Sequence, residues 1–91
     1  MKGNIQNLSD LFKETGQAHH QAYIETDGYD PEWPIWYAEY LLDKLPSFIE
    51  ASLTKSELVY LMVHLNKIQP DEAPEESWAS FYARYMIEHY S

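Results

Sequence analysis

The stretch WPIWYAEYLLD at residues 33–43 decides the fold, because it returns 45 residues later as WASFYARYMIE at residues 78–88. The two segments align without a gap, and the same offset pairs Leu8 with Leu53 and His19 with His64. Identical residues within the two segments occupy Trp33 and Trp78, Tyr37 and Tyr82, Ala38 and Ala83, and Tyr40 and Tyr85. A fixed offset is typical of a duplicated supersecondary unit. We therefore predict two repeats, at about residues 8–45 and 53–90.

Convergence of two amphipathic helices with aromatic stripes is the alternative to duplication. Both explanations predict helices, since apolar side chains recur at three-four spacing in four segments and no alternating β-branched run occurs. We predict one all-α domain over residues 1–91. Its four helices form two αα-hairpins related by a pseudo-twofold axis, with residues 9–44 superposing on residues 54–89.

Local signals predict where the helices begin and end. Ser9 is a suitable N-cap for the first helix, which should end near Thr26. Residues 27–31, DGYDP, carry turn chemistry before the second helix. Residues 54–57, TKSE, form a capping box for the third helix, and Pro70 should stop that helix.

The composition indicates an acidic domain without cysteine chemistry. Fifteen acidic residues oppose six basic ones, which gives a formal charge of −9, and there is no cysteine. Nucleic acid and anionic membranes are poor partners for such a chain, because phosphate binding draws on clustered Lys and Arg. Residues 1–6 lack the apolar segment of a signal peptide, and no apolar run is long enough to span a membrane. We expect a cytoplasmic protein.

The adjacent histidines His19 and His20 invite a metal hypothesis, but their spacing argues against it. Neighbours on a helix point about 100° apart, whereas metal-binding helices use i, i+3 or i, i+4 pairs. His19 instead has Tyr23 one turn later, and His64 has Tyr60 one turn earlier. We predict structural histidines bonded to tyrosine or to a backbone carbonyl, with no metal and no cofactor. A site built from His19, His64 and loop carboxylates remains the alternative.

No catalytic motif is present, so we predict no catalytic residue. Nucleophile elbows, phosphate loops and zinc-protease motifs are all absent. The aromatic stripe of the second helix could form core, a dimer face or the wall of an apolar pocket. If it forms core, Trp33 and Trp78 should both be largely buried, and Glu39 should pair with Arg84 across the axis. The candidate ligand-binding residues are His19, His20, Tyr23, Trp33, Trp36 and Tyr37.

Residues 19–41 carry a family resemblance. HHQAY at residues 19–23, followed by DGYDPEWPIWYAEYL at residues 27–41, resembles a signature of small bacterial helical proteins of unassigned function. The His-His pair with the Asp-Pro-Glu-Trp-Pro-x-Trp-Tyr-Ala string carries that resemblance. It implies a small helical domain and transfers no catalytic residue.

We interpret the chain as a non-enzymatic helical binding or interaction module. Its expected partner is a second copy of the chain, in a homodimer, or another protein. The alternative is a small-molecule or metal-assisted enzyme with its site around His19, His20 and the loop of residues 27–33. An accessory subunit of a larger protein is a third interpretation. An enzyme of this kind needs a concave pocket that joins His20 to the Asp30 loop.

Overall fold

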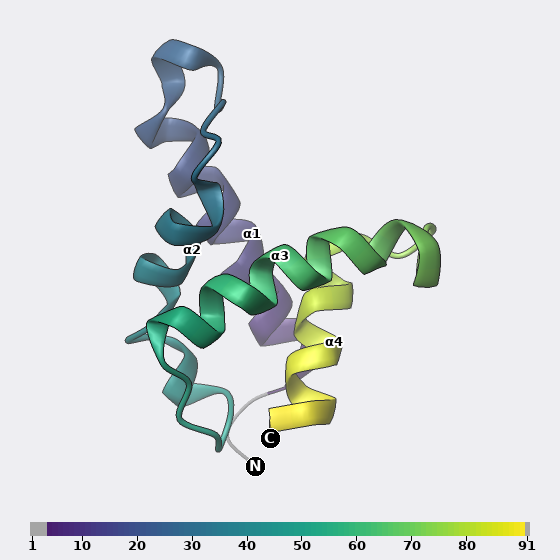
Figure 1. Ribbon diagram of the computed structural model, residues 1–91. Coiled ribbons are helices and arrows are strands. Elements are labelled where there is room, and N and C mark those ends of the chain that lie inside the picture. The colour runs from purple at the N-terminus through teal and green to yellow at the C-terminus, as the bar shows by residue number, and fades with distance from the viewer. Residues whose placement is uncertain (1–3, 91) are drawn as a thin grey trace.

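A computed structural model describes residues 4–90, which form four α-helices and two short 3-10 helices (Figure 1). The helices are α1 (Ile5–Ala22), α2 (Trp33–Leu41), α3 (Lys55–Glu72) and α4 (Trp78–Tyr90), with 3-10 helices at Ile24–Thr26 and Leu45–Ser47. No strand occurs between residues 4 and 90. The prediction of an all-α chain with four helices is therefore confirmed for this range. None of the helices described is both long enough and apolar enough to cross a membrane.

The start of α1 differs from the prediction. The Asn4 side chain caps the helix by accepting a hydrogen bond from the Asn7 N–H at 2.8 Å. Ser9, the predicted cap, lies inside the helix and is buried, with its Oγ 3.4 Å from Ser80 Oγ on α4. Asn and Ser are equally good caps, so side-chain chemistry could not decide between them.

The predicted capping box of α3 is confirmed, but the predicted stop at Pro70 is wrong. Thr54 Oγ1 accepts from the Glu57 N–H at 3.1 Å, and Glu57 Oε1 accepts from the Thr54 N–H at 2.8 Å. The helix continues through Pro70 to Glu72. The Gln69 side chain supports this end by donating to the carbonyls of Ala73 and Glu76, both at 2.9 Å. A proline removes only one helical donor, and the extra bonds offset part of that loss.

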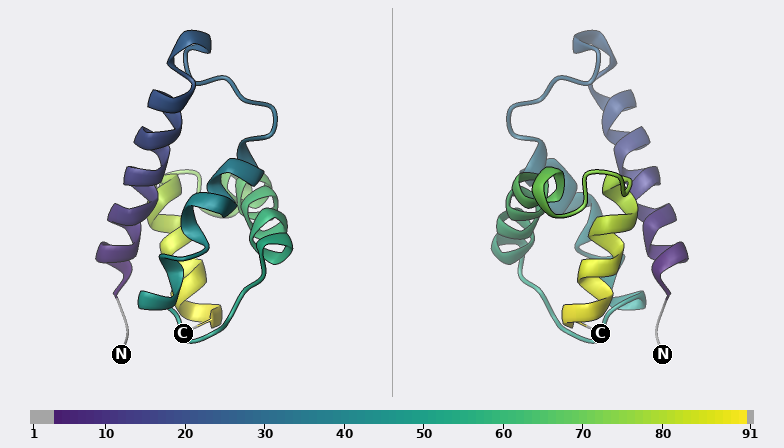
Figure 2. Two further views of the ribbon diagram at one scale, coloured as in Figure 1. Left: turned by 90° about the vertical axis from the view of Figure 1, so that its left-hand side faces the viewer. Right: turned by 90° about the vertical axis from the view of Figure 1, so that its right-hand side faces the viewer.

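The core lies where α1 packs against α4 and α2 packs against α3, which are the two most extensive helix contacts. Figure 2 shows α1 and α4 side by side, with the start of α1 and the end of α4 at one end of the molecule. All four helices contribute fully buried apolar side chains, among them Leu8, Phe12, Leu41, Leu58, Met62, Leu65 and Met86. A pseudo-twofold that exchanges the hairpins would also exchange these two contacts. Superposition of the two repeats nevertheless stays a prediction.

Two predictions about the aromatic helices are wrong. Trp33 is half-buried and packs against the core, but Trp78 is 36% exposed, so the two tryptophans are not matched core anchors. Trp78 is the first residue of α4, where part of its indole extends beyond the helix contacts. Glu39 and Arg84 also do not pair with each other. Glu39 accepts from Lys55 at 2.8 Å, and Arg84 pairs with Glu76 at 2.8 Å and with Glu88 at 3.4 Å.

Candidate aromatic groove

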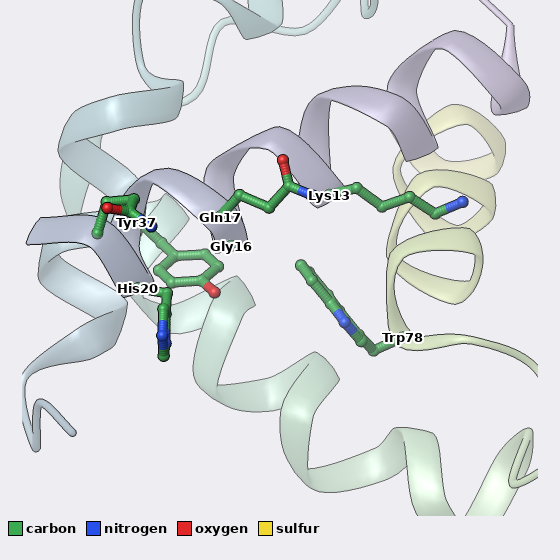
Figure 3. A pocket seen from close by; sticks show the side chains of 7 residues that line it. Lys13, Gly16, Gln17, His20, Tyr37 and Trp78 are labelled. Atoms are coloured by element: carbon green, nitrogen blue, oxygen red, sulfur yellow. The ribbon is translucent and has the colours of Figure 1, made fainter. Parts of the chain in front are cut away.

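A groove of about 790 Å³ lies between α1, α2 and the start of α4. Figure 3 shows its side chains: Lys13, Gln17 and His20 project from successive turns of α1, with Tyr37 and Trp78 facing them from α2 and α4. The α1 residues share one face because they are three, four and seven positions apart. We call this hollow the Trp78 groove.

Gly16 forms the floor of the Trp78 groove and permits the close approach of its two aromatic walls. A Cβ atom at Gly16 would lie 3.2 Å from Cζ2 of Trp78 and 3.4 Å from the hydroxyl of Tyr37. The first distance is tighter than ordinary van der Waals contact. The glycine therefore lets the indole and the phenol converge on the backbone of α1, although glycine costs about 1 kcal/mol in a helix relative to alanine.

The aromatic walls are held by edge contacts with buried rings. The Trp78 ring centroid lies 5.3 Å from that of Tyr82, 6.3 Å from that of Tyr37 and 6.4 Å from that of Phe12. Burial raises the pKa of the Tyr37 phenol, and burial together with repulsion from Tyr37 raises the pKa of Tyr82 to about 12. Both phenols therefore stay protonated at neutral pH, and Tyr37 can donate a hydrogen bond into the groove.

Lys13 gives the Trp78 groove a positive charge that no described residue pairs with. Lys55, Lys44 and Arg84 each form an ion pair, whereas Lys13 forms none with any residue from 4 to 90. None of the described residues that line the groove is acidic. In a chain with a formal charge of −9, the groove is therefore locally neutral to basic.

His20 links the Trp78 groove to the loop between α1 and α2. A Cβ atom at Gly28 would lie 2.7 Å from Nδ1 of His20, so the imidazole sits directly over this glycine. Gly28 also has a φ of 86°, in the left-handed region that favours glycine. Two separate constraints therefore require glycine at this position, and the path of the loop positions His20.

His19 points away from the groove and closes the same loop from inside. It is 7% exposed, and its Nε2 lies 3.1 Å from Oδ2 of Asp30. Its ring also contacts the rings of Tyr23, Trp36 and Tyr37, at centroid distances of 4.9, 5.1 and 5.3 Å. The expected tyrosine or carbonyl partner is thus replaced by a carboxylate, and the tyrosines make ring contacts instead.

The Asp30 carboxylate is held in its ionised form. Burial opposes ionisation, but the hydrogen bonds from His19 and from the Glu32 N–H outweigh it, so the pKa of Asp30 lies below its ordinary value of 3.8. An ionised carboxylate only accepts hydrogen bonds, so Nε2 of His19 carries the proton between them. Burial and the nearby Asp30 charge also raise the pKa of Tyr23.

The six candidate ligand-binding residues do not form one site. His20 and Tyr37 line the Trp78 groove, while Trp33 lines a neighbouring hollow of about 300 Å³ that shares Tyr37 and Trp78 with it. Tyr23 and Trp36 line a separate hollow of about 260 Å³ beside Asp30. His19 is buried and lines none of these three hollows. Of the six predicted residues, Tyr37 lines both the Trp78 groove and the neighbouring hollow.

Sequence reasoning missed Lys13, Gln17 and Trp78 as groove residues. The helical spacing of Lys13, Gly16, Gln17 and His20 was a visible signal, since these positions share one face of α1. Trp78 was expected in the core, and no sequence pattern marks which tryptophan of a stripe stays exposed.

No group of three or more His, Asp or Glu side chains within residues 4–90 is placed to hold a metal ion. Comparison with known proteins adds no assignment, since no family model, curated protein or solved structure matches the chain.

Proposed function

We propose that the protein is a non-enzymatic binding module, and that the Trp78 groove holds a small planar organic molecule. The exposed indole of Trp78 carries this proposal. It is fixed by three neighbouring rings and by the Gly16 floor, yet 36% of its surface stays open to the groove and solvent. A rigid aromatic surface binds a flat ligand at low entropic cost. The volume of about 790 Å³ is within the usual range for small-molecule sites.

The arrangement of His20 and Asp30 favours binding over catalysis. An enzyme around the loop of residues 27–33 needs one pocket that joins these two side chains. His20 lines the Trp78 groove, whereas Asp30 lines a different hollow with Tyr23 and Trp36. The carboxylate and imidazole that pair, Asp30 and His19, are nearly buried, which supports a structural role for them.

Ligand titration followed by NMR tests this proposal. Naphthalene-2-carboxamide, a neutral planar probe, should shift the indole N–H signal of Trp78 more than those of Trp33 and Trp36. Trp78→Leu should lose binding, and Tyr29→Leu, which changes an exposed aromatic residue outside the groove, should keep it. Equal weak shifts across the protein, or unchanged binding by a folded Trp78→Leu variant, contradict the proposal.

We further propose that the module self-associates through the exposed face of α3. Tyr60 is 66% exposed and Val63 is 48% exposed on this face. Ser56, Tyr60, Val63 and Lys67 are four, three and four positions apart, so they form one stripe along the helix. All four side chains are exposed.

The α3 stripe complements a second copy of itself. A twofold axis between positions 61 and 62 would place Tyr60 opposite the partner's Val63 in an antiparallel pair of helices. Lys67 would then lie beside the partner's Ser56 and Glu57, so opposite charges meet twice. Lys67 has no ion pair with any residue that the structure describes.

Charge exchange tests the dimer by sedimentation velocity. Lys67→Glu and Glu57→Lys should each weaken self-association, and an equimolar mixture of the two variants should restore it as a heterodimer. Lys13→Glu makes the same charge change outside the stripe and should leave the dimer intact. A monomeric wild-type protein at about 100 μM, where dimers of micromolar affinity persist, contradicts this part of the proposal.

A further inference from the structure

We propose that the Trp78 groove selects a planar organic carboxylate, with the ammonium group of Lys13 as its counter-charge. This inference rests on the proposed function, because it names the class of small molecule that the groove takes. It commits to a free small molecule of one or two fused rings rather than to a macromolecule.

Charge distinguishes the Trp78 groove from the hollow beside Asp30. The hollow with Tyr23 and Trp36 is lined by three carboxylates, Asp30, Glu32 and Glu39. The Trp78 groove has Lys13 as its lining ammonium group and no acidic residue among the described residues that line it. An anion entering the groove therefore gains an ion pair with Lys13 without displacing an existing partner, and it meets no adjacent carboxylate.

The polar groups of the groove are suited to an acceptor ligand. Lys13 offers three N–H donors, the amides of Gln17 and Gln21 each offer two, and the Trp78 indole offers one. The phenol of Tyr37 adds an O–H donor, since burial raises its pKa and keeps it protonated. A carboxylate only accepts hydrogen bonds, so a groove lined by donors suits it, with Lys13 as the charged one.

The spacing along α1 sets the shape of the ligand. Lys13 and His20 are seven residues apart, which corresponds to about 10 Å along a helix. Trp78 packs against Gly16, between these two positions. A flat ring system lying against the indole would thus extend its carboxylate toward Lys13, while its opposite edge approaches Tyr37 and His20 (Figure 3).

A matched pair of probes tests the inference. Naphthalene-2-carboxylate and naphthalene-2-carboxamide have nearly the same shape and differ in charge, and both can be titrated by calorimetry and by NMR. The wild-type protein should bind the carboxylate about fivefold more tightly, the size expected of one exposed charge contact. Lys13→Gln should bring the two affinities together and leave carboxamide binding unchanged.

Lys55→Gln is the matched control, because it removes the same charge from an exposed site at the start of α3, outside the groove and outside the proposed dimer stripe. It should preserve the preference for the carboxylate. Equal affinity of the wild-type protein for both probes overturns the anion inference while leaving groove binding in place. An equal loss in both lysine variants also overturns it, since the charge effect would then be nonspecific. Failure of both probes to bind at millimolar concentration overturns the inference and the proposed function together.

Discussion

The two halves of the chain, which align in sequence at an offset of 45 residues, differ in the polar contacts between their helices. In the first half, His19 bonds to Asp30 across the loop between α1 and α2. In the second half, His64 stacks on Tyr60 at 5.7 Å, and the Gln69 side chain bonds the backbone between α3 and α4 instead. Apolar positions that align between the halves can thus both be buried while the polar residues of each half make different contacts.

The equivalent tryptophans show the same divergence. Trp33 is half-buried at the start of α2, whereas Trp78 at the start of α4 is exposed in the groove against Gly16. The residue equivalent to Gly16 in the second half is Leu61, which is buried. A leucine cannot provide the same open floor, so this feature distinguishes α1 from α3.

The largest effect is expected from the shared core, where the halves should behave alike. Leu41 and Met86 occupy equivalent positions and are both fully buried. Leu41→Ala and Met86→Ala should each lower the free energy of unfolding by about 2–5 kcal/mol, since each leaves a cavity. Chemical denaturation measures both. If the costs of the two substitutions differ by more than about 2 kcal/mol, which is most of the spread expected for such substitutions, the two positions are not equivalent in the core.

The next effect should separate the halves, because Gly28 and Ala73 are equivalent positions with opposite backbone requirements. Gly28 has a φ of 86° and lies under His20, whereas Ala73 has a φ of −147°. Gly28→Ala should destabilise the fold by about 1–3 kcal/mol, while Ala73→Gly should cost about 1 kcal/mol or less. Thermal unfolding checks the pair. A Gly28→Ala variant as stable as the wild type would refute the strained loop.

The helix caps provide a smaller comparison. Asn4 accepts one backbone hydrogen bond, whereas Thr54 belongs to a reciprocal capping box. Asn4→Ala and Thr54→Ala should each cost about 0.5–2 kcal/mol. Hydrogen exchange should show the loss mainly in the first turn of the helix concerned. If Asn4→Ala has no effect while Ser9→Ala destabilises that turn, α1 begins at Ser9 after all.

Sequence patterns predicted the helices because periodic apolar residues and the capping box are local signals. They did not locate the true start of α1, since Asn4 and Ser9 offer the same chemistry. They also missed the extension past Pro70, which depends on the Gln69 side chain reaching two carbonyls.

The candidate site was harder to predict, because it is assembled from three helices. Tyr37 and His20 were identified from local composition, and both line the Trp78 groove. The contributions of Lys13 and Trp78 depend on how α4 packs against Gly16. Such a contact joins residues more than sixty positions apart in the chain, so spacing alone cannot reveal it.

The smallest expected effect is a difference in acid sensitivity between the two loops. Asp30 has a pKa below its ordinary value of 3.8, because hydrogen bonds to its ionised form outweigh its burial. The unfolded chain then binds a proton more readily than the folded chain does. The stability contributed by Asp30 is therefore complete well above pH 4 and is lost as the pH falls through the lower, folded pKa.

Asp30→Asn should remove this contribution, so its free energy of unfolding should fall less steeply than that of the wild type below about pH 4. Glu75→Gln, at the equivalent position in the second half, removes one exposed carboxylate and serves as the control. This control separates the effect of the His19–Asp30 contact from the effect of removing a negative charge. Urea unfolding at several pH values between about 2.5 and 6, which bracket the ordinary carboxyl range, measures all three slopes. If the free energy of unfolding falls with pH equally steeply in Asp30→Asn and in the wild type, the His19–Asp30 contact does not distinguish the first loop from the second.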